Sequence, residues 1–133
     1  MPPEERGRIS HAQAICHAAT GLAEDLKVAA IAAFTRSGRT AQLLSVERPP
    51  VPVYAFTSEP HVYRRLALWW GLTPILEPFS TDSDGMIREI EGSLVARQAL
   101  VPGDLAVVVG ALPFRPGAHT NFVKLHSVSA ARR

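Results

Sequence analysis

Apolar and polar residues alternate along this chain in blocks that predict helices and strands in regular succession. Residues 28–34 form seven consecutive apolar positions, and residues 105–109 form a second fully apolar run. Runs of this kind are typical of strands that are covered on both faces, as in the centre of a parallel sheet. We therefore expect these two strands to lie side by side in the middle of one sheet.

Helical spacing of apolar residues predicts helices between the strands, over about 11–25 and 39–46, then after residue 58 and after the segment 80–84. Shorter strands are expected at 53–56, 73–77 and 120–128. Pro74 places the strand at 73–77 on an edge of the sheet, because proline cannot donate to a ladder. The connection at 113–119 is too short for a crossover helix, so the last strand should run antiparallel to its predecessor.

This order, α-β-α-β-α-β-α-β-β, predicts a three-layer α/β/α sandwich with a five-stranded, mostly parallel sheet. Residues 10–129 should form this single domain, preceded by a flexible lead-in at 1–9 and followed by a tail at 130–133. Ser10 and Gln13 have the spacing of a capping box for the first helix.

The third helix should be capped by Ser58 or Thr57 and closed by Gly71. Its apolar spacing predicts a buried stripe, in which the two tryptophans provide core and helix-edge packing. This stripe consists of Val62, Leu66, Trp69 and Trp70. Alternatively, one of the two tryptophans belongs to a subunit contact, because large aromatic side chains concentrate in protein interfaces.

Composition narrows the class of protein. The 133 residues are 47% hydrophobic and 20% charged, with a formal net charge of +2. That charge is too small to favour nucleic-acid binding, and no apolar run reaches the length of a membrane span. A single cysteine excludes an internal disulfide and is consistent with a cytoplasmic location.

The lone Cys16 is expected to pack as a small apolar residue in the first helix. The histidines lack the spacing of a metal site, and we expect no metal and no cofactor. The four histidines outside the 113–119 connection should lie at the surface. They are His11, His17, His61 and His126.

The turn after the first strand carries the strongest functional signal. It offers hydroxyl groups, guanidinium groups and a glycine at the start of a helix, where free N–H groups and the helix dipole favour an anion. We expect it to bind a phosphate through Thr35, Arg36, Ser37, Gly38, Arg39 and Thr40. The loop at 113–119 leaves the other apolar strand at the same edge, where ligands of such sheets bind.

Several segments in the same order make the chain similar to a known family. These are 30–41, 44–49, 68–74, 102–105, and 115–117 with 120–121. From about His11 to Val128 the chain resembles the C-terminal domain of pyruvate kinase.

The resemblance implies a five-stranded α/β unit that is attached to a catalytic barrel and carries an allosteric effector site and part of a tetramer contact. In the family the turn corresponding to Thr35–Thr40 cradles an effector phosphate. The loop corresponding to Arg115, Pro116 and Gly117 folds over the effector. The full-length family transfers a phosphoryl group from phosphoenolpyruvate to ADP.

Two departures from the family pattern concern the choice of effector and the capacity for catalysis. Members activated by fructose 1,6-bisphosphate meet its second phosphate with a tryptophan and an arginine, and residues 77–87 contain neither. A monophosphate, either a sugar phosphate or a nucleotide, is therefore at least as good a candidate. The barrel residues that would hold metal ions and phosphoenolpyruvate are also missing.

Three hypotheses follow. The leading one is a regulatory domain that binds a phosphorylated effector, has no catalytic residues of its own, and acts with a separate or attached catalytic chain. The second is an oligomerisation module that pairs with other copies through the last strand or first helix and keeps a vestigial phosphate site. The third is a small phosphate-ester enzyme, for which the sequence offers no nucleophile.

Overall fold

The computed structural model describes residues 10–79, 82–111 and 120–129. Within them the helices and strands follow one another in the predicted order. They are α2 (His11–Leu26), β1 (Ala30–Phe34), α3 (Arg39–Glu47), β2 (Val53–Thr57), α4 (Pro60–Leu66), β3 (Leu72–Leu76), α5 (Ser83–Ala96), β4 (Leu105–Gly110) and β5 (Phe122–Ser127).

The strands form one five-stranded sheet in the order β3-β2-β1-β4-β5. β1 lies at its centre, where Ala33 is opposite Ala55 of β2 on one side and Val109 of β4 on the other. The first four strands are parallel, and β5 runs antiparallel to β4. The predicted fold class is therefore confirmed, including the pairing of the two apolar runs.

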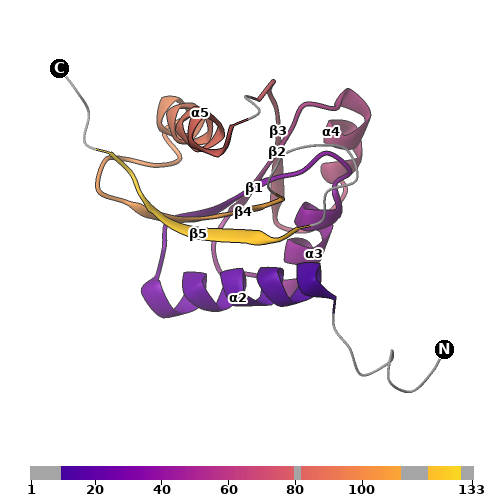
Figure 1. Ribbon diagram of the computed structural model, residues 1–133, viewed down its shortest axis with the longest axis horizontal. Helices are drawn as coiled ribbons and strands as arrows, with labels where there is room; N and C mark the ends of the chain where they lie inside the picture. The colour runs from indigo at the N-terminus through magenta and orange to yellow at the C-terminus, as the bar shows by residue number, and fades with distance from the viewer. Residues whose placement is uncertain (1–9, 80–81, 112–119, 130–133) are drawn as a thin grey trace.

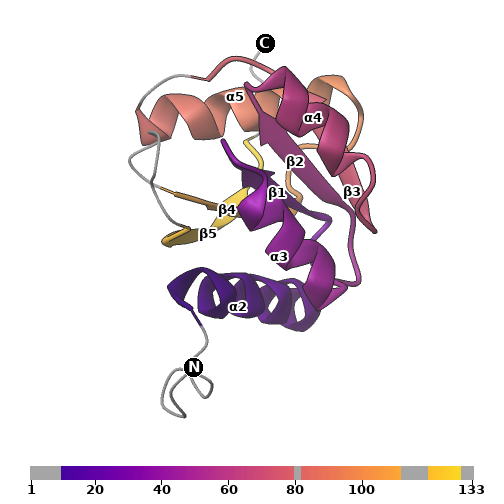
Figure 2. The same ribbon diagram turned by 90° about the vertical axis from the view of Figure 1, so that its right-hand side faces the viewer.

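Helices cover both faces of this sheet. Apolar residues of α2, α3 and α4 pack on one face, and those of α5 pack on the other. Figures 1 and 2 show α5 on one side of the sheet and α2 on the opposite side. Alternate residues of β1 point into the two cores, Ile31 and Ala33 toward α2 and Ala32 and Phe34 toward α5. Every residue of β1 is buried, which explains its uninterrupted apolar sequence.

The start of α2 and the edge position of β3 also agree with the sequence. Ser10 Oγ accepts a hydrogen bond from the Gln13 backbone, and the Gln13 side chain accepts one from Ser10 N–H, which completes the capping box. Pro74 lies in β3, which pairs only with β2. α2 ends at Leu26 and is capped by Lys27, whose left-handed backbone has a φ of 50°.

The third helix differs from the prediction. Its N-cap is Glu59 rather than Ser58 or Thr57, because Pro60 takes the first helical position. The Thr57 hydroxyl instead accepts a hydrogen bond from Glu59 N–H at 3.2 Å. Gly71 has a φ of 73° but lies beyond the helix, in the turn that leads into β3.

The expected burial of both tryptophans is also wrong. Val62 and Leu66 are buried, but Trp69 and Trp70 are 39% and 51% exposed. The chain tightens after α4, since Trp69 N–H donates to Leu66 O three residues back rather than four. The tryptophans are thereby turned away from the sheet.

Cys16 is fully buried, as expected, and His11, His17 and His61 are exposed. His126 is not a surface residue, because its side chain is only 15% exposed and is hydrogen-bonded to Glu91 of α5. Among the described residues, no helix combines the length and the apolar character that crossing a membrane requires.

Candidate functional site

The turn between β1 and α3 is held in shape by its own first hydroxyl. Thr35 is buried, and its Oγ1 accepts a hydrogen bond from Gly38 N–H at 2.8 Å. Its backbone N–H donates to Phe56 O of β2 at 2.9 Å, which anchors the turn to the sheet. Thr35 therefore holds the predicted site in shape from its buried side, and its hydroxyl already has a hydrogen-bond partner.

Gly38 is the N-cap of α3 and has a φ of 93°, a conformation that favours glycine. A Cβ atom at this position would lie 3.3 Å from Val62 Cγ1 and 3.4 Å from Leu66 Cδ2. α4 thus packs directly against the turn. The backbone angle favours glycine here, and the approach of Val62 leaves little room for a side chain.

The N-terminus of α3 keeps donors available. Ser37 is exposed, and its Oγ accepts a hydrogen bond from Arg39 N–H at 3.3 Å. The next two N–H groups, of Thr40 and Ala41, donate to no acceptor within the described part of the chain. These N–H groups point out of the positive end of the helix dipole, where an anion is favoured.

Guanidinium groups surround the same turn. Arg36 Nη2 lies 3.5 Å from Glu59 Oε1, and both side chains are partly exposed. Arg65 of α4 donates from Nη2 to the Ser37 carbonyl at 3.2 Å. Arg39 is exposed at the first position of α3. Three cations and one carboxylate give the turn a net positive charge.

Thr40 has a structural role that its sequence position did not reveal. It is buried, and its Oγ1 lies 2.5 Å from Thr120 Oγ1, so the two hydroxyls share a hydrogen bond. The Thr40 carbonyl also accepts a weak hydrogen bond from Cys16 Sγ at 3.7 Å. Thr40 thus ties α3 to α2 and to the residue that leads into β5, and only its N–H remains for a ligand.

The two segments expected to converge do so at their described ends. Asn121 N–H donates to Gly110 O at 3.1 Å, and Thr120 contacts Thr40, so both flanks of the 112–119 segment lie at the carboxyl edge of β1 and β4. The predicted contributors Arg115 and Gly117 lie outside the described residues.

Sequence reasoning missed Glu59, Arg65 and Thr120. Glu59 follows β2, which is parallel to β1, and the shared carboxyl edge of these strands could have indicated its approach to Arg36. Arg65 lies on the polar side of its helix, where apolar spacing predicts only exposure to solvent. Its bond to Ser37 depends on how α4 packs against Gly38, which apolar spacing does not encode.

Chemically the turn is a set of hydrogen-bond donors and cations that suits an oxyanion. The described residues contain no cluster of three or more histidine, cysteine or acidic side chains that could hold a metal ion. Burial raises the pKa of Cys16 to about 12, and the negative charge of Glu47 adds to this effect, while Arg39 opposes it. The thiol is therefore protonated at neutral pH and acts as a packing group.

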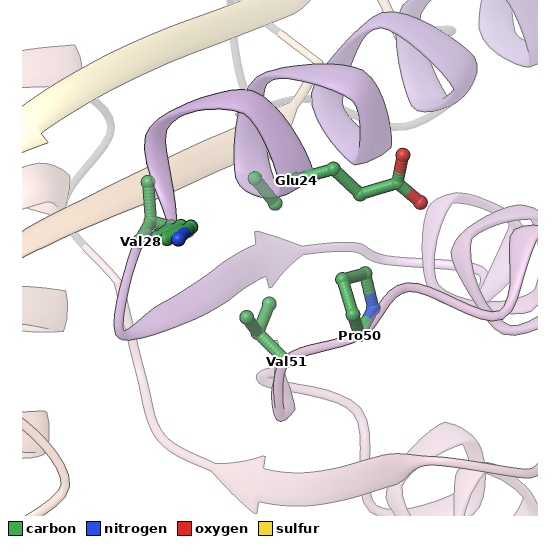
Figure 3. A pocket seen from close by; sticks show the side chains of 6 residues that line it. Glu24, Val28, Pro50 and Val51 are labelled. Carbon is green, nitrogen blue, oxygen red and sulfur yellow. The ribbon is translucent and has the colours of Figure 1, made fainter.

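The structure also has a groove, which lies at the other end of the strands. Its volume is about 320 Å³, and it is lined by Ala23, Glu24, Lys27, Val28, Pro50 and Val51. Figure 3 shows Glu24 and Val28 on one side and Pro50 and Val51 on the other. These residues precede β1 and β2, whereas the turn at 35–40 follows β1.

Comparison with known proteins agrees with this architecture. The family model described as "Pyruvate kinase, alpha/beta domain" matches residues 13–126. Pyruvate kinase of Mycobacterium tuberculosis (strain H37Rv) is 35% identical over 128 residues, which are 96% of this chain and 26% of that protein. Pyruvate kinase of Corynebacterium efficiens is 36% identical over 126 residues, 95% of this chain and 25% of that protein.

Solved structures show the same fold. Cryptosporidium parvum pyruvate kinase in complex with ADP superimposes with a TM-score of 0.81 at 24% identity, over 92% of this chain and 24% of that one. The chain therefore spans about a quarter of the length of the relatives that it matches. With the family model covering most of its residues, the chain belongs to the pyruvate kinase alpha/beta-domain family.

Proposed function

We propose that this chain is a non-catalytic regulatory domain of pyruvate kinase type, which binds a phosphorylated effector at the turn formed by residues 35–40. The observation that carries the proposal is the N-terminus of α3, where the N–H groups of Thr40 and Ala41 have no acceptor in the described residues. A phosphate placed there would also meet the Ser37 hydroxyl and the guanidinium of Arg39.

The position of the turn within the sheet supports the same proposal. From β1 the chain proceeds to β2 on one side, and β4 lies on the other side, so the strand order reverses between β1 and β4. Ligands of open α/β sheets bind beyond the carboxyl ends of the strands at such a reversal. The turn at 35–40 leaves β1 at this place.

The effector class that we infer is a monophosphate, a sugar phosphate or a nucleotide. Residues 77–87 supply neither the tryptophan nor the arginine expected for a second phosphate. The carboxylate of Glu77 is engaged with the Ser93 hydroxyl at 2.6 Å and lies 3.5 Å from Arg97. An anionic group at the start of this segment is unfavourable for another phosphate.

We infer that phosphoryl transfer is carried out by the part of the pyruvate kinase relatives that lies outside the region similar to this chain. The relatives are pyruvate kinases about four times as long as the matched region. We propose that this domain acts together with such a catalytic part, attached or as a separate chain, in the cytoplasm.

Isothermal titration against a panel of sugar monophosphates and nucleoside monophosphates tests the effector proposal. We expect at least one member to bind with micromolar to millimolar affinity. Arg36→Ala combined with Ser37→Ala should weaken that binding by about tenfold or more, since charge-assisted hydrogen bonds contribute about 1.5–3 kcal/mol each. Arg88→Ala, on the exposed side of α5, is the matched control and should leave the affinity unchanged. Absence of binding across the panel would contradict the proposal.

A second candidate function, oligomerisation through the last strand, is favoured by the edge position of β5. Lys124 and Leu125 of this strand are exposed, and β5 pairs only with β4. An exposed edge strand can pair with another copy. Sedimentation equilibrium distinguishes this candidate, because a chain that is monomeric at every concentration excludes it.

A further inference from the structure

The edge strand β5 carries a lysine and a histidine on the same face, toward α5. Side chains of a strand alternate between its two faces, so Lys124 and His126 lie on one side of β5. Their partners in register on β4 are Val108 and Ala106, which both belong to the core beneath α5. The pair therefore lies on the face of the sheet that α5 covers, outside the 35–40 turn.

A carboxylate of α5 orients the histidine. His126 Nε2 lies 2.5 Å from Glu91 Oε2, and the two side chains are only 15% and 18% exposed. The other carboxylate oxygen accepts a hydrogen bond from Ser129 N–H at 3.1 Å. Although burial tends to raise the pKa of Glu91, these hydrogen bonds lower it, so the carboxyl group is ionised at neutral pH. An ionised carboxylate only accepts hydrogen bonds, and it therefore fixes the imidazole proton on Nε2.

The second ring nitrogen faces the lysine amine. Lys124 Nζ lies 2.9 Å from His126 Nδ1. Because Nε2 carries the imidazole proton, Nδ1 presents its lone pair and accepts a hydrogen bond from Nζ. Lys124 itself is exposed, so a reagent from solvent reaches its amine. A nucleophile in contact with a base that a third group orients is the arrangement of an activated nucleophile.

The other histidine–carboxylate pair of the described residues lacks these features. His17 Nδ1 lies 3.0 Å from Glu47 Oε1, but the imidazole is 77% exposed. Its second ring nitrogen makes no hydrogen bond within the described part of the chain. This pair provides a natural comparison, because it has the same two side-chain types without a neighbouring amine.

We propose that Lys124 is an acylation site, at which its side-chain amine takes an acyl group from a thioester with His126 as the general base. The neutral amine donates one N–H to Nδ1, which turns the lone pair of Nζ toward solvent. Nζ attacks the carbonyl carbon of the thioester, an N–C bond forms, and the C–S bond breaks. Nδ1 takes the proton that Nζ loses, and the thiolate leaves with the bonding electron pair.

The proton then passes from the imidazolium to the thiolate, so the products are an amide on Lys124 and a free thiol. Glu91 is a positioning residue, which holds the ring and stabilises the transient imidazolium. A thioester suits this site because a thiol, with an ordinary pKa of about 8.5, leaves as thiolate without prior protonation.

Acylation has a physical consequence for the edge of the sheet. It converts a cationic side chain into a neutral amide. Lysine on an exposed edge strand opposes pairing with another chain, and β5 pairs only with β4. Acylation of Lys124 would therefore remove a charge that disfavours association through this strand.

The chain contains its own reference for the test, because its two lysines are Lys27 and Lys124. Lys27 is exposed, and its side chain makes no hydrogen bond or ion pair with any described residue. The probe is the acetyl thioester of N-acetylcysteamine, which carries no phosphate for the 35–40 turn. Peptide mass spectrometry follows acetylation of both lysines over time. We expect Lys124 to react about tenfold or more faster than Lys27, since a positioned general base typically contributes about 100-fold or more.

His126→Gln separates base catalysis from exposure. Glutamine can still accept a hydrogen bond from Lys124 but cannot take its proton, so the two lysines should then react within about twofold of each other. His17→Gln is the matched control and should leave the ratio of the two rates unchanged. Circular dichroism checks that both variants fold like the unmodified chain.

Unfolding the unmodified chain in urea provides a test that needs no variant. The contact between Lys124 and His126 is lost there, and the two rates should become similar. The proposal is overturned if the two lysines of the folded chain react equally fast. It is also overturned if the ratio persists in urea or in folded His126→Gln. None of these outcomes depends on effector binding, so this proposal and the proposed function stand or fall separately.

Discussion

Individual residues of the 35–40 turn divide into those that shape it and those that remain available to a ligand. The hydroxyls of Thr35 and Thr40 are buried and already hydrogen-bonded. Ser37 and Arg39 are exposed on the outside of the turn. The sequence predicts the residue types that an anion site needs. It does not reveal which hydroxyls face inward, because that depends on Phe56, Thr120 and other partners distant in the chain.

Glu91 of α5 makes contacts that could not be predicted from the sequence. Its carboxylate accepts hydrogen bonds from His126 of β5 and from Ser129 N–H, the latter at 3.1 Å. Lys124 Nζ lies 2.9 Å from the other ring nitrogen of His126. Burial tends to raise the pKa of Glu91, but these hydrogen bonds and the nearby imidazole outweigh burial and hold the pKa below its usual value of 4.5.

Acid stability tests this carboxylate. Because the pKa of Glu91 is lower in the folded state, its ionised carboxylate stabilises the fold at pH values above its ordinary pKa of 4.5. This stabilisation is lost as the pH falls through the folded-state pKa. We expect Glu91→Gln to be less stable than the unmodified chain at neutral pH and to lose less stability on acidification. Thermal unfolding between about pH 7 and pH 3 measures both effects. Parallel pH dependence in the two proteins would show that the contact does not contribute.

At the scale of elements, the order and type of the helices and strands followed from apolar periodicity. The two apolar runs correctly predicted the central strands, and Ser10 with Gln13 correctly predicted the start of α2. The end of α4 could not be predicted in this way, because residues 67–70 continue the apolar spacing while their backbone tightens into a turn. Trp69 and Trp70 are exposed because of that turn, although their residue type and spacing favour burial.

Gly110 of β4 is the glycine at which packing leaves no room for a side chain. A Cβ atom there would lie 2.4 Å from two ring carbons of Phe34, which is 1% exposed, so the buried ring or the strand would have to shift. Gly110→Ala should therefore lower the free energy of unfolding by about 1–3 kcal/mol, a typical cost of overpacking.

Gly92→Ala is the matched control for this substitution. Gly92 lies inside α5 and is exposed, and no atom lies within 4 Å of the position that a Cβ would take there. Alanine at this position should raise stability by about 0.5–1 kcal/mol, because glycine is unfavourable within helices. Urea unfolding followed by circular dichroism measures both variants. Equal stability of Gly110→Ala and the unmodified chain would contradict the packing of Phe34 on β4.

At the scale of the whole molecule, the parallel sheet separates two surfaces with different chemistry. Cations lie beyond the carboxyl end of β1, together with N–H groups that have no acceptor in the described part of the chain, and exposed apolar side chains lie at the amino ends of β1, β2 and β3. The sequence predicted the contiguous part of the first surface, residues 35–40, but not Glu59 and Arg65, which contact it from a distant part of the chain. Of the second surface the sequence indicated only a subunit contact for one of the two tryptophans, because this surface is assembled from three separate helix-to-strand connections.

The proposed function requires that residues 35–40 and the first turn of α3 bind a phosphoryl group. Amide nuclear magnetic resonance during titration with a sugar monophosphate or a nucleoside monophosphate tests this requirement most directly. We expect the N–H signals of Thr40 and Ala41 to shift downfield together and saturate, while those of Val28 and Val51 at the opposite groove stay unchanged. Saturable shifts at the groove with none at Thr40 and Ala41 would contradict the proposed function.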